Sequence, residues 1–209
     1  MQVWRASRSK LGSIALTGGV FTLLLLALTG AIGAAESPKL KSGVFNPPRP
    51  APEFALKGSD GSELNLGRYR GKVVALGFGY TFCPDVCPTT LVELAEVRKK
   101  LGAGGADFQV VYVTVDPERD SAERMRSYLA AFDPTFMGAT GTPEQLANVR
   151  KAYGISASKK TVEGTKSAYL VHHSSFVYII DRSGNLRALR PFGASVDDIV
   201  QDVKVLLKK

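Results

Sequence analysis

Residues 73–78 have the sequence VVALGF, and residues 83–88 have the sequence CPDVCP. A continuous apolar run of this length, bounded by turn residues, predicts a buried strand. Residues 88–101 then place apolar side chains at helical spacing, and Gly102 marks the end of the helix. We therefore predict that two cysteines lie between the end of a buried strand and the start of a helix.

Further elements are expected on both sides of this unit. The pattern predicts a short hairpin over 54–66, a buried strand over 108–115, helices over 121–132 and 143–153, a loop or hairpin over 154–168, strands over 176–180 and 186–189, and a last helix after Ser195. Strand, helix, strand, helix, hairpin and closing helix is the order of the thioredoxin fold. We expect an α/β protein with a thioredoxin-like fold, in which helices flank a central mixed sheet.

The first 52 residues differ in composition from the rest. Residues 1–10 are basic and residues 11–35 carry no charge, which predicts a signal peptide or a signal-anchor transmembrane helix over 1–35. We favour an uncleaved hydrophobic anchor. Because the basic flank comes first, the following chain is expected to be exported. Five prolines predict a stiff linker over 36–52, which leaves 53–209 for the thioredoxin-like domain.

The charge of the chain argues against nucleic acid as a partner. The formal net charge is +8, from 27 basic and 19 acidic residues, and the basic residues are scattered along the sequence. We expect a mildly basic soluble surface, although attraction to anionic lipid or to an acidic protein is an open alternative.

The two cysteines, Cys83 and Cys87, are expected to be chemically reactive. Pro88 suits the first turn of a helix, so the thiols lie at a helix N-terminus, which favours thiolate. Thiolate is the form that binds metals and attacks disulfides. A plain stabilising disulfide is the alternative, but it would close a very small loop and contribute little.

The only histidines in the chain are His172 and His173. They precede the strand expected near 176, which in this fold lies beside the strand that delivers the cysteines. Two thiolates and one imidazole form a soft ligand set, which favours copper over zinc, because structural zinc usually takes four ligands. A fourth ligand would have to come from the second histidine or from a carboxylate such as Asp116.

Three segments of the sequence resemble the Sco/SenC family. They are GYTFCPDVCP at 79–88, VDPERD at 115–120 and YLVHHS at 169–174, and the resemblance extends from about residue 50 to the C-terminus. It implies that Cys83, Cys87 and His173 bind copper as Cu(I) or Cu(II), and that the two cysteines form a redox-active pair. The family often has an aspartate where this chain has His172, which leaves open whether His172 is an alternate ligand or only changes the local charge. His172 and Asp116 are the candidate auxiliary groups.

The resemblance also implies a role. Members of this family are copper metallochaperones, or thiol-dependent assembly factors, for the binuclear copper centre of cytochrome c oxidase. The implied partners are cytochrome c oxidase subunit II and other periplasmic copper chaperones or thiol reductases. The implied location is the bacterial inner membrane, with the domain in the periplasm. We therefore expect a metallochaperone rather than an enzyme.

Three other functions share parts of this pattern. An exported thiol–disulfide oxidoreductase would use the same two cysteines, but it usually has two residues between them and a proline before the strand near 176. A peroxidase of the peroxiredoxin type would not need two cysteines this close or a paired histidine. A copper or redox sensor is compatible with all of these residues.

Overall fold

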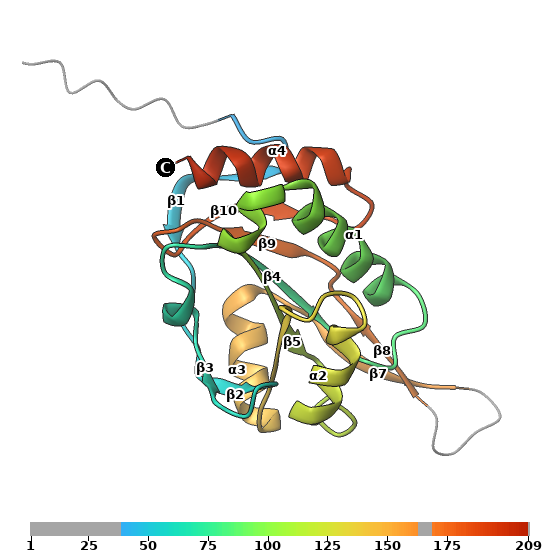
Figure 1. Cartoon of the computed structure of the whole chain (residues 1–209). Helices are drawn as coiled ribbons and strands as arrows, with labels where there is room; N and C mark the ends of the chain where they lie inside the picture. The colour runs from blue at the N-terminus through green and yellow to red at the C-terminus, as the bar shows by residue number, and fades with distance from the viewer. Residues whose placement is uncertain (1–38, 163–168, 209) are drawn as a thin grey trace, which may run out of the picture. The chain divides into compact units, whose positions relative to one another are not determined.

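The computed structural model of the chain describes residues 39–162 and 169–208. Within these ranges an eight-stranded sheet forms the centre of the domain (Figure 1). Its strands, in spatial order, are β1 (Gly43–Pro50), β10 (Asn185–Arg190), β9 (Val177–Ile180), β4 (Val73–Gly79), β5 (Phe108–Thr114), β6 (Met137–Thr140), β2 (Leu56–Gly58) and β3 (Glu63–Leu64). Strands β4, β5 and β6 are parallel and the other pairs are antiparallel, which confirms the predicted mixed sheet and thioredoxin-like fold.

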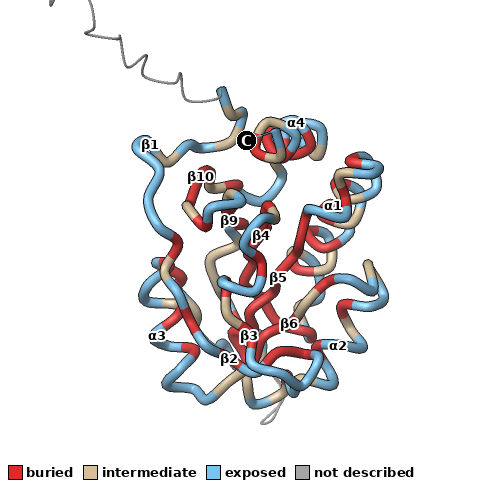
Figure 2. Tube along the Cα trace, turned by 60° about the vertical axis from the view of Figure 1, so that its left-hand side comes forward, coloured by how far each residue is buried: buried red, intermediate tan, exposed pale blue. Residues whose placement is uncertain are grey.

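Helices cover both faces of this sheet. Helices α1 (Val86–Lys100), α2 (Ala122–Ala130) and α4 (Val196–Leu207) lie on one face, and α3 (Pro143–Tyr153) lies on the other (Figure 2). The ring of Phe78 contacts Tyr153 of α3, while the alternate residues of β4 face α1. Because both faces are covered, every residue of β4 is buried, as its unbroken apolar sequence predicts.

A second, two-stranded sheet lies beside the domain centre. Strands β7 (Ala157–Thr161) and β8 (Tyr169–His173) pair in antiparallel register, so that Ala157 lies opposite His173. This is the hairpin expected as one alternative for residues 154–168, and its second strand extends beyond that range. It brings His173 to the base of the hairpin, next to the central sheet.

The predicted linker over 36–52 is partly a strand. Residues Gly43–Pro50 form β1, which pairs with β10 at the edge of the sheet. Prolines are tolerated on an edge strand, because only one side of that strand has to supply hydrogen bonds. This part of the segment therefore belongs to the folded domain.

Two other boundaries differ from the sequence-based prediction. Strand β6 was not predicted, since its four residues include Gly138 and form no apolar run. Helix α1 begins at Val86 rather than at residue 88, so Cys87 lies inside its first turn.

The predicted signal peptide or anchor over 1–35 lies outside the described residues. In the part of the chain that the structure describes, no helix is both long and apolar enough to span a bilayer.

Candidate metal centre

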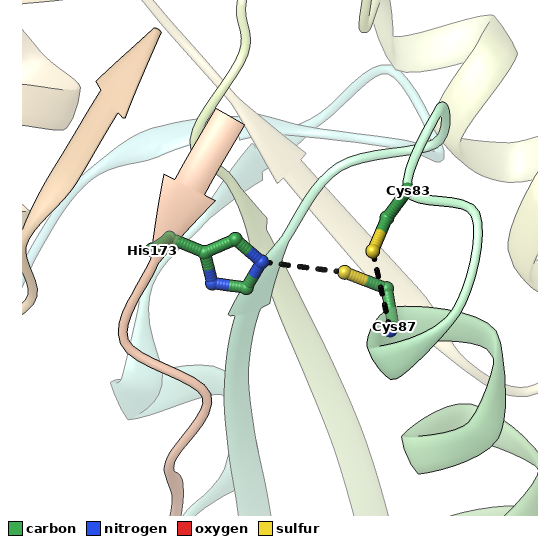
Figure 3. Close-up of side chains that lie close together, drawn as sticks. All are labelled: Cys83, Cys87 and His173. Atoms are coloured by element: carbon green, nitrogen blue, oxygen red, sulfur yellow. Dashed lines mark hydrogen bonds between the residues drawn. The ribbon is translucent and has the colours of Figure 1, made fainter. Parts of the chain in front are cut away.

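The site forms where three separate segments meet. Strand β4 ends at Gly79, the following loop carries Cys83, and the first turn of α1 carries Cys87 (Figure 3). His173 is the last residue of β8 and points its ring at the thiols. Both sulfurs and one ring nitrogen of His173 lie within 4.8 Å of one another. The strand, the helix and the hairpin therefore converge on one point.

The two thiols have different environments. Cys83 is partly exposed, whereas Cys87 is only 1% exposed. A hydrogen bond from the Cys87 thiol to the Cys83 sulfur is the largest cause that lowers the pKa of Cys83, to about 4. The backbone N–H of Cys87 also donates to this sulfur, over 3.4 Å. The pKa of Cys87 is raised, because its thiol donates to Cys83 and because it is buried. Cys83 is thus the thiolate and Cys87 holds the proton.

The hydrogen bonds of His173 fix its tautomer. Its Nδ1 lies 2.9 Å from the carbonyl oxygen of Ser174, and a carbonyl only accepts, so Nδ1 carries the proton. The unprotonated Nε2 faces the sulfur of Cys87 at 3.4 Å. In metal sites, the ring nitrogen that does not bind the metal usually donates a hydrogen bond, and this bond fixes the orientation of the imidazole. His173 therefore presents a lone pair to the thiols.

Two contacts hold the hairpin that carries His173. The Tyr80 ring packs edge-on against the His173 ring, at 5.9 Å between centroids, and its hydroxyl accepts a hydrogen bond from the backbone N–H of Val171. The Tyr169 hydroxyl donates to the Asp116 carboxylate over 2.8 Å, and Arg119 pairs with the same carboxylate. Asp116 thus ties the end of β5 to β8.

The two auxiliary groups named from the sequence are not part of the ligand cluster. Among the described residues, that cluster contains Cys83, Cys87 and His173 but neither His172 nor Asp116. His172 is exposed, because consecutive side chains on a strand point to opposite sides. The carboxylate of Asp116 is already bonded to Tyr169 and Arg119.

Two further buried residues shape this site, and neither was among the candidate site residues expected from the sequence. The Asp120 carboxylate accepts hydrogen bonds from the backbone N–H and the hydroxyl of Thr81 and from the hydroxyl of Thr114, which fixes the start of the cysteine loop. Tyr112 is 2% exposed, and its hydroxyl and the Cys87 sulfur both lie next to Gly79. In the sequence, Tyr112 is one residue of a predicted buried strand and nothing links it to the cysteines. The glycines at 77 and 79, which leave room for its ring, were the one sequence feature that could have indicated a bulky neighbour there.

An exposed aromatic residue lies next to the thiols. Phe82 precedes Cys83 and is 43% exposed, and its ring packs against the guanidinium groups of Arg119 and Arg124, at 4.6 and 4.0 Å from the ring centroid. It forms an apolar surface, bordered by positive charge, beside the partly exposed Cys83.

The donor atoms of the cluster suit a soft metal ion. Two sulfurs and one imidazole nitrogen match the preference of Cu(I), and the nitrogen also supports Cu(II). The described cluster has three protein ligands, one fewer than the closed four-ligand set of structural zinc. Fold and site together define a thioredoxin-like protein with two cysteines and a histidine arranged to hold a soft metal ion.

Comparison with known proteins identifies the family. The family model described as SCO1/SenC matches residues 46–208, and the chain belongs to this family. A SCO2-like protein of Rickettsia prowazekii is 33% identical over 131 residues, which cover 63% of this chain and 64% of that protein. The chain thus matches less than two thirds of the length of that relative.

Solved structures of the same family share the fold. ScoI of Bradyrhizobium japonicum, solved with copper bound, is 31% identical with a TM-score of 0.69, and the match covers 75% of this chain and 98% of that one. Apo Sco1 of Thermus thermophilus is 35% identical with a TM-score of 0.71, covering 80% and 97%.

Proposed function

We propose that this protein binds copper through Cys83, Cys87 and His173 and serves the assembly of the binuclear copper centre of cytochrome c oxidase. The observation that carries the proposal is the convergence of two sulfurs and one imidazole nitrogen within 4.8 Å. The copper-bound state of ScoI from Bradyrhizobium japonicum, a structure with the same fold, supports copper as the ion. Copper is here the cargo of the protein.

The asymmetry of the thiols suggests an order for copper transfer. A thiolate site releases Cu(I) by ligand exchange, in which an incoming partner thiolate replaces one protein ligand at a time. Cys83 is the partly exposed ligand, so it is the first to be replaced. Cys87 is buried and is replaced last. The exposed Phe82 next to Cys83 gives the partner an apolar surface to dock on.

A second function, reduction of a partner disulfide, is favoured by the lowered pKa of Cys83. The Cys83 thiolate attacks the partner disulfide and forms a mixed disulfide, releasing one partner thiolate. Cys87 then loses its proton and attacks Cys83, which releases the second partner thiolate. The pair of cysteines gives up two electrons and ends as a disulfide, while the partner disulfide becomes a dithiol.

We propose that residues 1–35 anchor the protein in the bacterial inner membrane, with the domain in the periplasm. The uncharged run behind a basic flank supports this orientation. Subunit II of cytochrome c oxidase is the proposed partner, together with periplasmic copper chaperones or thiol reductases. Protease treatment of intact spheroplasts should degrade the domain, and protection of the domain would refute the orientation.

Copper titration tests the metal-binding proposal. Reduced protein is titrated with Cu(I) and Cu(II), and X-ray absorption reports the ligand types. We expect one copper per chain with two sulfur ligands and one nitrogen ligand, and loss of tight binding in Cys83→Ala and His173→Ala. His172→Ala is the matched control, because it removes the neighbouring exposed imidazole and should bind normally.

Two outcomes would overturn the proposal. Normal copper affinity in His173→Ala would exclude that ring as a ligand. If that variant also reduced protein disulfides efficiently, the thiol–disulfide exchange function would replace copper binding as the main role.

A further inference from the structure

Tyr112 lies next to Cys87, the buried cysteine of the pair. It belongs to β5, in register with Gly77 of the neighbouring strand β4, and its ring lies over that strand. A methyl group added to Gly79 would lie 2.0 Å from the Tyr112 hydroxyl oxygen and 2.8 Å from the Cys87 sulfur. The absence of a side chain at Gly79 therefore leaves the space in which this hydroxyl and this sulfur meet.

The hydroxyl of Tyr112 acts as a hydrogen-bond donor to Cys87. A buried tyrosine hydroxyl needs a partner, and the hydroxyl of Tyr112, a residue that is 2% exposed, lies beside the Cys87 sulfur at Gly79. Burial raises the pKa of Tyr112 well above its ordinary value, so the hydroxyl keeps its proton. The sulfur of Cys87 is the acceptor.

We propose that Tyr112 is a positioning residue that fixes the Cys87 sulfur and stabilises the dithiol form of the Cys83–Cys87 pair relative to its disulfide. The inference depends on the proposed function only in taking these two cysteines as the redox pair. The reduced pair holds one proton between its two sulfurs and carries a net negative charge, whereas the disulfide is neutral, so a donor forms the stronger hydrogen bond with the reduced pair. The hydrogen bond from Tyr112 therefore stabilises the dithiol form more than the disulfide form.

The equilibrium that measures this effect is exchange with glutathione. The protein disulfide and two glutathione thiols are in equilibrium with the protein dithiol and glutathione disulfide. Two electrons and two protons pass from glutathione to the protein, so the atoms and charges balance. The metal-free protein is equilibrated in glutathione buffers, quenched with acid, and its free thiols are counted by alkylation and mass spectrometry.

Tyr112→Phe removes only the hydroxyl and keeps the ring. We expect its equilibrium constant to shift about tenfold towards the disulfide, which corresponds to about 30 mV for a two-electron couple. Tyr69→Phe is the control, because the Tyr69 hydroxyl is buried without a hydrogen-bond partner among the described residues. It should leave the equilibrium unchanged.

A second variant keeps the tyrosine but disturbs its contact. Gly79→Ala places a methyl group against both the Tyr112 hydroxyl and the Cys87 sulfur, which drives the two apart and should shift the equilibrium in the same direction as Tyr112→Phe. An unchanged equilibrium in Tyr112→Phe would overturn the inference, as would an equal shift in Tyr69→Phe. Circular dichroism and a cooperative unfolding transition confirm that each variant is folded.

Failure of this inference can be told apart from failure of the proposed function. If wild-type protein does not bind copper, the function fails but the glutathione equilibrium still reports the role of Tyr112. If copper binds with one ion per chain and the equilibrium does not change on removing the hydroxyl, only the role of Tyr112 fails.

Discussion

The substitution Gly79→Ala tests how tightly the cysteine pair is packed. An alanine methyl group would lie 2.0 Å from the Tyr112 hydroxyl oxygen, 2.6 Å from the adjoining ring carbon and 2.8 Å from the Cys87 sulfur. Unstrained atoms do not approach this closely, so the tyrosine ring or the first turn of α1 has to move. The side chains of Tyr112 and Cys87 are both buried, at 2% and 1% exposure, so either movement disturbs packed atoms.

The expected cost follows from overpacking a buried site. Added methyl groups in a packed core cost about 1–3 kcal/mol. Replacing glycine also stabilises the folded state by about 0.4–1 kcal/mol, because the unfolded chain loses freedom. We expect a net loss of about 1.3 kcal/mol, which lowers the Tm by about 3–5 °C for a domain of this size.

Thermal unfolding of the reduced, metal-free protein measures this loss. Gly104→Ala is the matched control, because its methyl group would meet only the end of the Leu207 side chain, at 3.3 Å. The control should stay within about 0.5 kcal/mol of wild type. A Gly79→Ala protein with wild-type Tm and wild-type copper affinity would refute the packing described for Tyr112 and Cys87.

Three further predictions address reactivity and anchoring. In reduced, metal-free protein, alkylation of Cys83 by iodoacetamide should be nearly constant from pH 6 to 8 and should fall only as the pH drops through about 4, since the hydrogen bond from the Cys87 thiol lowers its pKa; a rate that climbs between pH 7 and 9 would contradict this. Asp120→Ala leaves the Thr81 N–H without its carboxylate acceptor and should cost about 3 kcal/mol in urea unfolding; a loss below about 1 kcal/mol would show that the cysteine loop does not depend on this carboxylate. Asp202→Ala removes the buried acceptor of the Lys41 N–H, at 2.6 Å, and should speed trypsin cleavage after Lys41 roughly tenfold; unchanged cleavage, followed by mass spectrometry, would be inconsistent with that anchoring role.

Elements with strong local patterns were predicted well. The apolar run at 73–78 became the fully buried strand β4, and the residues from Pro143 to Tyr153 form α3 within the predicted bounds. Helix α3 ends at Gly154, which adopts a left-handed conformation; glycine is the residue that most often ends a helix in this way, so this helix end can be recognised in the sequence. Such elements are fixed by residues close together in the chain.

Elements that depend on a neighbouring strand were missed. Strand β6 has four residues, and it is a strand because it pairs with β5 and β2. Strand β1 is rich in proline and is a strand because β10 offers it a free edge. Neither sequence has the periodicity of an independent strand, so the pairing partner had to be known first.

By itself, the sequence determined that the two cysteines lie between the end of a buried strand and the start of a helix, because all of these residues are neighbours in the chain. Only the tertiary structure decided which groups surround them. His173 lies 86 positions from Cys87 and reaches it through a hairpin, while adjacent His172 points away. Tyr112 reaches the same sulfur from the next strand. Contacts of this kind depend on strand register, and register is set by the packing of the whole sheet rather than by any local run of residues.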